Sequence, residues 1–109
     1  MKNITNEELS DLIEKAAAGD KNSLETVILN IQDFVFNLSL RMLGTFPDAG
    51  DATQDILLKV ITHLSSFKGE SAFSTWVFRI AANHLKNYQK HMFAKLPIPL
   101  SRMLRKNFM

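Results

Sequence analysis

Hydrophobic residues recur every three or four positions along most of the chain, the spacing expected of one buried helix face. The first such segment follows Thr5 and Glu8, which have the spacing of a capping box, and Gly19 ends it. Its apolar positions are Leu9, Leu12, Ile13 and Ala16. A second helix, capped by Asp20 or Asn22, has the longest apolar set and is expected to form the centre of the core. Its members are Leu24, Val27, Ile28, Ile31, Phe34, Val35, Leu38, Met42 and Leu43.

The segment 44–48 interrupts this pattern, because Pro47 lacks a backbone N–H and disfavours helical structure in the residue before it. We therefore expect a third helix from about Asp48. Its inward positions are Ala52, Ile56, Val60, Ile61 and Leu64, with Leu57 as a further candidate. Its opposite face carries Asp48, Asp51, Asp55, Leu58 and Lys59.

Residues 67–71 are expected to form a short connector, in which Gly69 can adopt the positive φ of a tight loop. A fourth helix, capped by Ser71 or Ser74, follows. Its buried side comprises Phe73, Val77, Ile80, Ala81, Leu85 and Tyr88, and its other sides carry Arg79, Asn83, Lys86, Asn87 and Lys90. The stretch KLPIPLS, after about Phe93, has the prolines of a linker. Because no β-alternating run occurs, the sequence predicts an all-α fold, a compact bundle of about four helices.

Composition narrows the class of protein. A chain of 109 residues is expected to form one domain, and 46% hydrophobic with 22% charged residues is typical of a soluble globular protein. The absence of cysteine excludes disulfides and thiolate zinc sites. We expect no signal peptide and no membrane segment, because no apolar run is long enough, and hence a cytoplasmic location.

Charge is distributed unevenly along the chain. Residues 1–55 carry four basic and ten acidic side chains, a net charge of −6, whereas residues 56–109 carry nine and one, a net charge of +8. A domain with an acidic half and a basic half is expected to have two different partners, one of them polyanionic.

Enzyme chemistry has little support in the sequence. His63, His84 and His91 do not pair with a nearby acid at metal-binding spacing, and we interpret each as an exposed helix histidine. No glycine-rich phosphate loop or nucleophile motif occurs. Asp51 and Asp55 lie one turn apart, which fits a solvated or partner-facing acidic face better than a metal site. We therefore predict no catalytic residue, metal or cofactor.

Features typical of nucleic-acid binding are concentrated in the connector and the fourth helix. Aromatic rings there are interspersed with basic residues, namely Lys68, Arg79, Lys86, Lys90 and, farther on, Lys95. This combination suits a single strand, whose bases stack on rings or enter a pocket while cations follow the phosphates. The apolar stripe favours a core position for Phe73 and leaves Trp76 open between packing and strand contact.

Two segments carry a more specific signal, DAGDATQDILLKV at 48–60 and FKGESAFSTWVFRIAANH at 67–84. They resemble region two, the core domain, of bacterial RNA polymerase sigma factors of the extracytoplasmic-function type. That family has an acidic D-A-x-D-x-x-Q-[ED] helix, followed by F-x-G-x-S-x-F-x-T-W-L-x-R-I-A-x-N. The matching positions are Asp48, Ala49, Asp51, Gln54, Asp55, Phe67, Gly69, Ser71, Phe73, Thr75, Trp76, Arg79, Ile80, Ala81 and Asn83.

The resemblance implies a non-catalytic transcription initiation domain with two binding surfaces. The acidic helix would bind the clamp helices of the β′ subunit of core RNA polymerase, through Asp48, Asp51, Gln54, Asp55, Leu58 and Lys59. The loop and fourth helix would recognise and open the minus-ten promoter element, with residues 67–71 holding a flipped-out base of the non-template strand. The implied DNA-binding residues are Phe67, Lys68, Gly69, Glu70, Ser71, Thr75, Trp76, Arg79, Asn83, Lys86 and Lys90. An anti-sigma factor is a further candidate partner.

The same resemblance implies a region-two domain at 1–93 and a linker and tail at 94–109, without the second, helix-turn-helix domain of these factors. Two pairs of residues depart from the family pattern: Gly50 and Ala52 in the acidic helix, and Val77 and Phe78 in the fourth helix. Gly50 is expected to weaken its helix by about 1 kcal/mol. The alternative function is a helical regulatory protein that binds only polymerase or an anti-sigma factor and does not recognise DNA.

Overall fold

The computed structural model describes residues 5–94, and side chains at residues 5–90. Its helices are α1 (Asn6–Ala17), α2 (Lys21–Leu43), α3 (Phe46–His63) and α4 (Phe73–Ala94), with a short 3₁₀ turn η1 (Leu64–Ser66) after α3. No strand occurs in this part of the chain, so the predicted all-α fold of four helices is confirmed. The expected linker falls almost entirely on residues 95–109, which lie outside the described residues.

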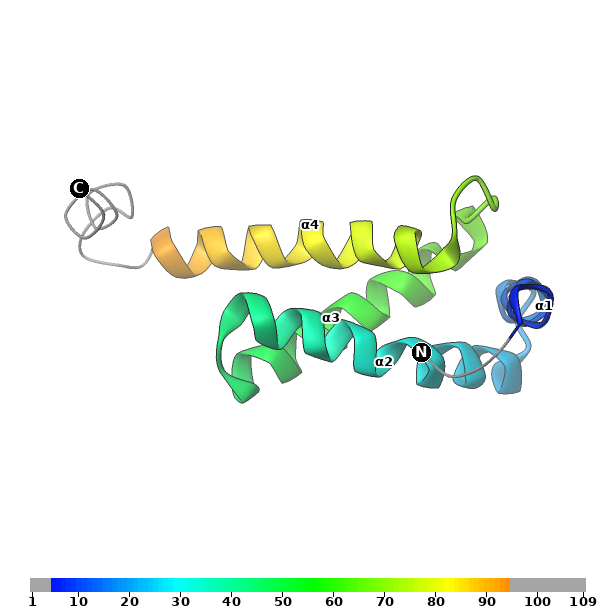
Figure 1. Cartoon of the computed structure of the whole chain (residues 1–109), viewed down its shortest axis with the longest axis horizontal. Coiled ribbons are helices and arrows are strands. Elements are labelled where there is room, and N and C mark those ends of the chain that lie inside the picture. Colours follow the sequence, from blue (N-terminus) through cyan, green and yellow to red (C-terminus); the bar gives the residue numbers. More distant parts are fainter. Residues whose placement is uncertain (1–4, 95–109) are drawn as a thin grey trace.

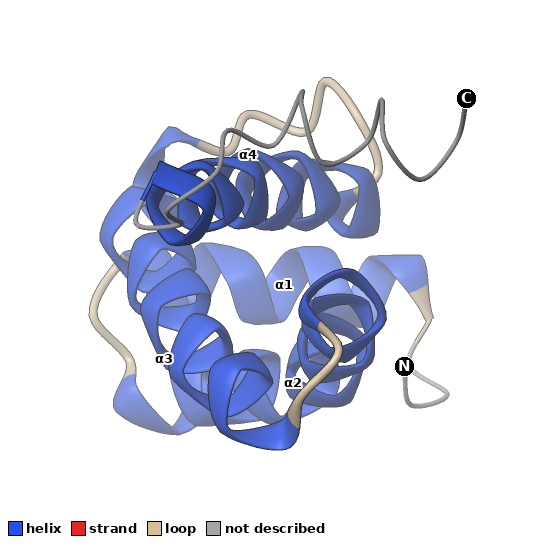
Figure 2. Ribbon diagram, turned by 90° about the vertical axis from the view of Figure 1, so that its left-hand side faces the viewer, coloured by secondary structure: helices blue, strands red, loops and turns tan. Residues whose placement is uncertain are grey.

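The helices pack as an antiparallel α2–α3 pair covered by α4, with α1 crossing one end (Figure 1). Viewed along the bundle, α2, α3 and α4 surround a common interior (Figure 2). Side chains that are fully or almost fully buried fill this interior: Ile13, Ala16, Val27, Ile31, Val35, Ala52, Ile56, Val60, Leu64, Phe73, Val77, Ala81 and Leu85. Every helix therefore contributes an apolar face to one hydrophobic core.

Polar side chains fix the helix ends largely as the sequence predicts. Thr5 accepts a hydrogen bond from the Glu8 N–H at 3.1 Å, and Asp20 accepts one from the Asn22 N–H at 3.2 Å. Gly44 ends α2 with a φ of 85°, a left-handed conformation that favours glycine. These contacts confirm the predicted starts of α1 and α2.

The predicted starts of the last two helices were less accurate. Helix α3 begins at Phe46, two residues before the expected start, and Thr45 is its N-cap. Pro47 lies in the first turn, where a backbone N–H makes no hydrogen bond within the helix, so proline is tolerated there. Neither expected serine caps α4, which begins at Phe73. Ser74 lies inside the helix, and the Ser71 hydroxyl donates to the Ala72 carbonyl at 3.2 Å.

The predicted inward positions hold with a few exceptions. Ile61 is 37% exposed, because α3 turns this position towards solvent, whereas Ala49 and Thr53 take buried places that the apolar pattern did not assign. Ile80 and Tyr88 of α4 are half-buried. The amide of Gln89 donates to the Met42 carbonyl at 2.9 Å, so α4 also satisfies a free carbonyl at the end of α2.

Candidate functional site

The three rings of the connector region form one aromatic cluster. Phe67 lies 5.3 Å from Phe73 and 5.3 Å from Trp76 between ring centroids, and Phe73 stacks on Trp76 at 5.7 Å. Phe73 is 5% exposed, so the predicted core position is confirmed. Phe67 and Trp76 are half-buried and pack against the core. Each therefore supports the fold and also reaches the surface.

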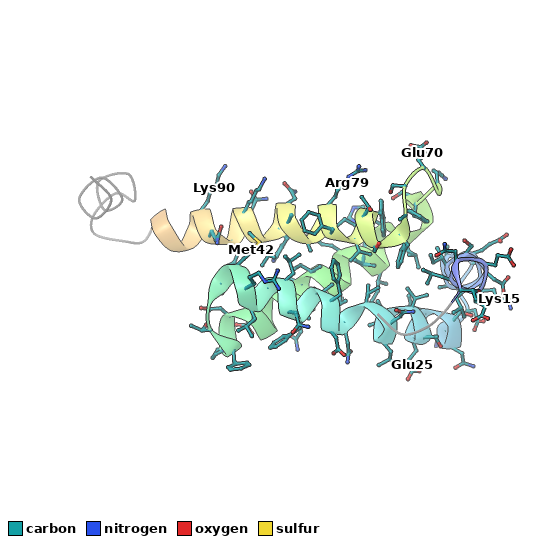
Figure 3. All side chains as sticks on the ribbon, viewed as in Figure 1. Lys15, Glu25, Met42, Glu70, Arg79 and Lys90 are labelled. Atoms are coloured by element: carbon teal, nitrogen blue, oxygen red, sulfur yellow. The ribbon has the colours of Figure 1, made fainter. Side chains whose placement is uncertain are left out.

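A hollow of about 300 Å³ lies where the 67–71 loop meets α1. Of the predicted DNA-binding residues, it is lined by Phe67, Gly69 and Ser71. Gly69 has a φ of 75°, the positive value expected for this loop. Lys68 and Glu70 are exposed and do not line it, and Glu70 points outward at the loop tip (Figure 3). We refer to this hollow as the loop hollow. Its other lining residues are Asn6, Leu9, Ser10, Ile13, Asn30, Ala72, Phe73 and Ser74.

Sequence reasoning missed most of the loop hollow. Its far wall comes from residues of α1 and from Asn30 of α2, which lie more than thirty residues before the loop in the chain and carry no local motif for this role. All of its lining residues are uncharged. The loop hollow therefore suits a neutral group better than a phosphate.

A second, more open groove of about 540 Å³ runs between α3 and α4. It brings together Trp76, Arg79 and Asn83 from α4 with Lys59 from α3, and it is also lined by His63, Ser66 and Ile80. Lys59 and Arg79 place a positive charge on each wall of this groove. The groove thus puts Lys59, predicted for the polymerase surface, beside predicted DNA-binding residues.

The remaining predicted DNA-binding residues lie along the outer side of α4. Thr75, Lys86 and Lys90 are exposed, and Figure 3 shows Arg79 and Lys90 pointing away from α2 and α3. Phe78 is 45% exposed, a surface ring that the sequence pattern did not assign. This side of α4 is therefore basic with one aromatic ring, a combination suited to a nucleic-acid strand.

The predicted polymerase surface is mostly assembled on α3. Asp51, Gln54, Asp55 and Lys59 are exposed, and Leu58 is 61% exposed. These residues form a polar surface around one apolar side chain.

Asp48 is bound within the chain and is only half-exposed. It accepts a hydrogen bond from the Tyr88 hydroxyl at 3.0 Å and another from the Thr45 hydroxyl at 2.8 Å. The hydrogen bond to Asp48 raises the pKa of Tyr88, because the carboxylate stabilises the protonated phenol. Asp48 therefore joins the first turn of α3 to α4.

The expectation that His84 is an exposed helix histidine was wrong. Its side chain is 14% exposed, and its Nε2 lies 3.7 Å from the Asp55 Oδ2 at the contact between α3 and α4. Burial and the nearby Lys59 lower its pKa below the usual 6.5, although Asp55 opposes this shift. His63 is exposed as expected, and the side chain of His91 lies outside the described residues.

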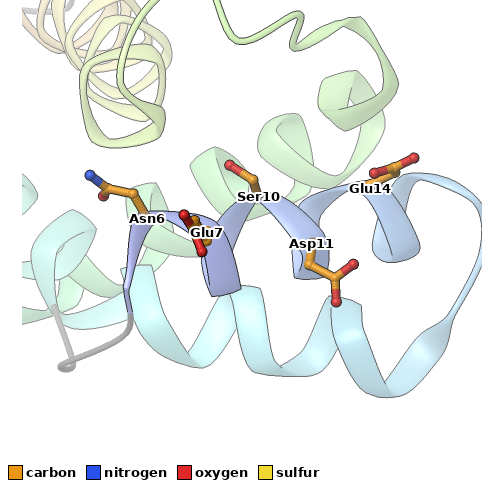
Figure 4. A pocket seen from close by; sticks show the side chains of 5 residues that line it. All are labelled: Asn6, Glu7, Ser10, Asp11 and Glu14. Carbon is orange, nitrogen blue, oxygen red and sulfur yellow. The ribbon is translucent and has the colours of Figure 1, made fainter.

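The largely acidic face of α1 lines a shallow hollow of about 410 Å³ (Figure 4). Glu7, Asp11 and Glu14 give it a negative charge that repels phosphates. Within the described residues, no cluster of histidine and carboxylate side chains could hold a metal ion. The described helices include none that is long and apolar enough to span a membrane.

The combination of an acidic α3 surface, a loop hollow and a basic α4 agrees with comparisons to known proteins. The family described as Sigma-70 region 2 matches residues 27–91. The chain belongs to this family. The resemblance to sigma factor region two is thereby confirmed, and the matched segment contains α3, the loop and nearly all of α4.

Curated relatives are sigma factors. The chain is 34% identical over 85 residues to the RNA polymerase sigma-H factor of Pseudomonas aeruginosa. This match covers 78% of this chain and 44% of the relative. It is 38% and 37% identical over 84 residues to the ECF RNA polymerase sigma-E factors of Haemophilus influenzae and Escherichia coli, covering 75% of this chain and 44% of each relative. The chain thus spans less than half the length of these relatives.

A solved structure shares the fold of this region-two domain. It is the NMR structure of an engineered region 2 of sigmaE in complex with GTAAAA. The two structures superpose with a TM-score of 0.74 at 29% sequence identity, over 90% of this chain and 100% of the other.

Proposed function

We propose that this chain is a promoter-recognition domain of an alternative sigma factor. It joins core RNA polymerase, bound at the exposed side of α3, to the non-template strand of a minus-ten element, bound by the loop and α4. The observation that carries the proposal is the position of the uncharged loop hollow directly before a basic helix. The domain acts by binding and performs no catalysis.

A single strand would use both features. Arg79, Lys86 and Lys90 contact phosphates, which makes the affinity fall with salt by a slope of about −0.7 for each phosphate neutralised. One base leaves the stack and enters the loop hollow, whose uncharged walls favour a neutral ring. Extrusion costs a few kcal/mol, which contacts in the hollow recover for the correct base.

The α3 surface would bind polymerase through Asp51, Gln54, Asp55 and Leu58. Carboxylates around an exposed leucine suit a basic surface with an apolar contact at its centre. The clamp helices of the β′ subunit are the expected partner. Asp48 makes a minor contribution, because its carboxylate is already hydrogen bonded to Tyr88 and Thr45.

Paired variants test the two surfaces separately. Arg79→Ala with Lys86→Ala is expected to abolish binding to a minus-ten single strand at moderate salt, while core polymerase is still captured in a pull-down. Asp51→Ala with Leu58→Ala is expected to do the converse. Lys21→Ala with Arg41→Ala removes two exposed charges of the same sign from α2 and serves as the matched control.

One outcome would overturn the DNA-binding half of the proposal. If neither the free chain nor its polymerase complex distinguishes a minus-ten oligonucleotide from a scrambled one at low salt, the domain does not read DNA. It would then be a helical regulator that acts by protein binding alone.

A further inference from the structure

Asn30 of α2 is a polar residue that folding leaves without a complete set of partners. Only 4% of its surface is exposed. Its Oδ1 is buried and has no hydrogen-bond partner in the part of the chain that the structure describes. A buried carbonyl oxygen without a donor costs free energy, so such atoms are rare in folded proteins unless water or a ligand completes them.

Asn30 lines the loop hollow, where a ligand could complete it. The walls beside it are apolar at Leu9, Ile13 and Phe73, and polar at Asn6 and Ser10. A nucleobase has the same two properties, since its faces are apolar and its edges carry hydrogen-bonding groups. A phosphate would find no cation among the lining residues. The surroundings of Asn30 therefore fit the edge of a base and not the backbone of a strand.

We infer that Asn30 determines which base the loop hollow accepts, its Oδ1 accepting a hydrogen bond from the exocyclic amino group of an extruded adenine or cytosine. This inference rests on the proposed function. The unpartnered atom is an acceptor, so the incoming group must be a donor. Adenine and cytosine carry an amino group where guanine and thymine carry a carbonyl oxygen, which would oppose Oδ1. The hollow thus selects bases that carry an amino group at purine position 6 or pyrimidine position 4, and it does so for either ring size.

Base analogues test this contact atom by atom. The whole chain is first used to select single-stranded hexanucleotides from a random pool, and one position is expected to be restricted to adenine or cytosine. At that position the amino group alone is then removed, by purine in place of adenine or 2-pyrimidinone in place of cytosine. The wild type is expected to bind the analogue about tenfold more weakly, as for the loss of one good base contact.

The variant Asn30→Leu keeps the approximate shape of the side chain and removes its polar atoms. It is expected to bind the parent and analogue strands equally, whereas Asn37→Ala, an exposed change on the same helix, keeps the tenfold difference. Circular dichroism and polymerase pull-down check that each variant is folded. If Asn30→Leu does not fold, Asn30→Ser is used in its place. A wild type that does not discriminate the analogue refutes the inference without any variant.

The possible failures are distinguishable. If the wild type binds single strands but does not discriminate the analogue, or if Asn30→Leu retains the tenfold difference, the role of Asn30 is refuted and the proposed function stands. If the wild type binds no single strand, either free or in its polymerase complex, the DNA-binding half of the proposed function fails together with this inference.

Discussion

Replacing Asp48 by alanine is expected to destabilise the domain without weakening polymerase binding. The carboxylate accepts hydrogen bonds from Tyr88 at 3.0 Å and Thr45 at 2.8 Å, and it lies in the first turn of α3. A hydrogen bond to a charged group contributes about 1.5–3 kcal/mol when buried, and an acidic residue at a helix N-terminus about 0.3–1 kcal/mol. Because Thr45 is exposed and Tyr88 half-buried, we expect a total loss of about 2 kcal/mol, or about 10 °C in Tm.

A double-mutant cycle isolates the contact between the helices. Urea unfolding is measured for wild type, Asp48→Ala, Tyr88→Phe and the double variant, with the exposed Asp33→Ala of α2 as a control expected to lie within about 0.5 kcal/mol of wild type. The Asp48–Tyr88 coupling should be about 1 kcal/mol. Additivity within about 0.3 kcal/mol would show that the hydrogen bond does not contribute in solution. A loss of polymerase affinity in folded Asp48→Ala would return Asp48 to the binding surface.

Two further predictions concern stability. The lowered pKa of His84 means that the unfolded chain binds a proton more readily, so the free energy of unfolding should fall as pH decreases through the unfolded pKa near 6.5 and level off below the folded pKa. His84→Gln should remove this slope in denaturant titrations at several pH values, and a slope that persists would assign it to other groups. Gly69→Ala should lower the free energy of unfolding by about 1–2 kcal/mol and weaken single-strand binding, because alanine is strained at a φ of 75°. Gly50→Ala, inside α3, should instead stabilise the domain by up to about 1 kcal/mol, since a Cβ there meets no neighbouring atom. Thermal melts measure both changes. Equal effects of the two glycine changes would contradict this account.

The sequence predicted the four helices because each must bury one apolar face, and a period of three to four residues records that requirement directly. The same periodicity could not fix the boundary of α3, since proline is permitted in a first turn as well as outside a helix. It also misplaced Ile61, whose exposure depends on how α3 is rotated against α2 and α4.

Contacts between distant segments were the part that the sequence did not predict. Tyr88 and Asp48 are forty residues apart, and Asn30 meets the loop only because α2 packs beneath it. His84 was interpreted as exposed because no acid lies near it in the sequence at metal-binding spacing, yet its side chain is 14% exposed and lies 3.7 Å from Asp55 of α3. A motif specifies residue types along one segment, whereas a hollow or a buried contact depends on which other segment packs there.

The geometry of α3 also determines which substitution can separate the two proposed surfaces. Asp55 lies 3.7 Å from His84 of α4, and one turn later Lys59 lines the groove that contains Arg79. Removing the Asp55 carboxylate would therefore alter the electrostatic surroundings of His84 and Lys59, and could change strand binding without any direct contact to DNA. Asp51 is exposed, and neither the groove nor the contact between Asp55 and His84 includes it. A defect of Asp51→Ala can thus be assigned to polymerase binding, whereas one of Asp55→Ala cannot without the strand-binding measurement beside it.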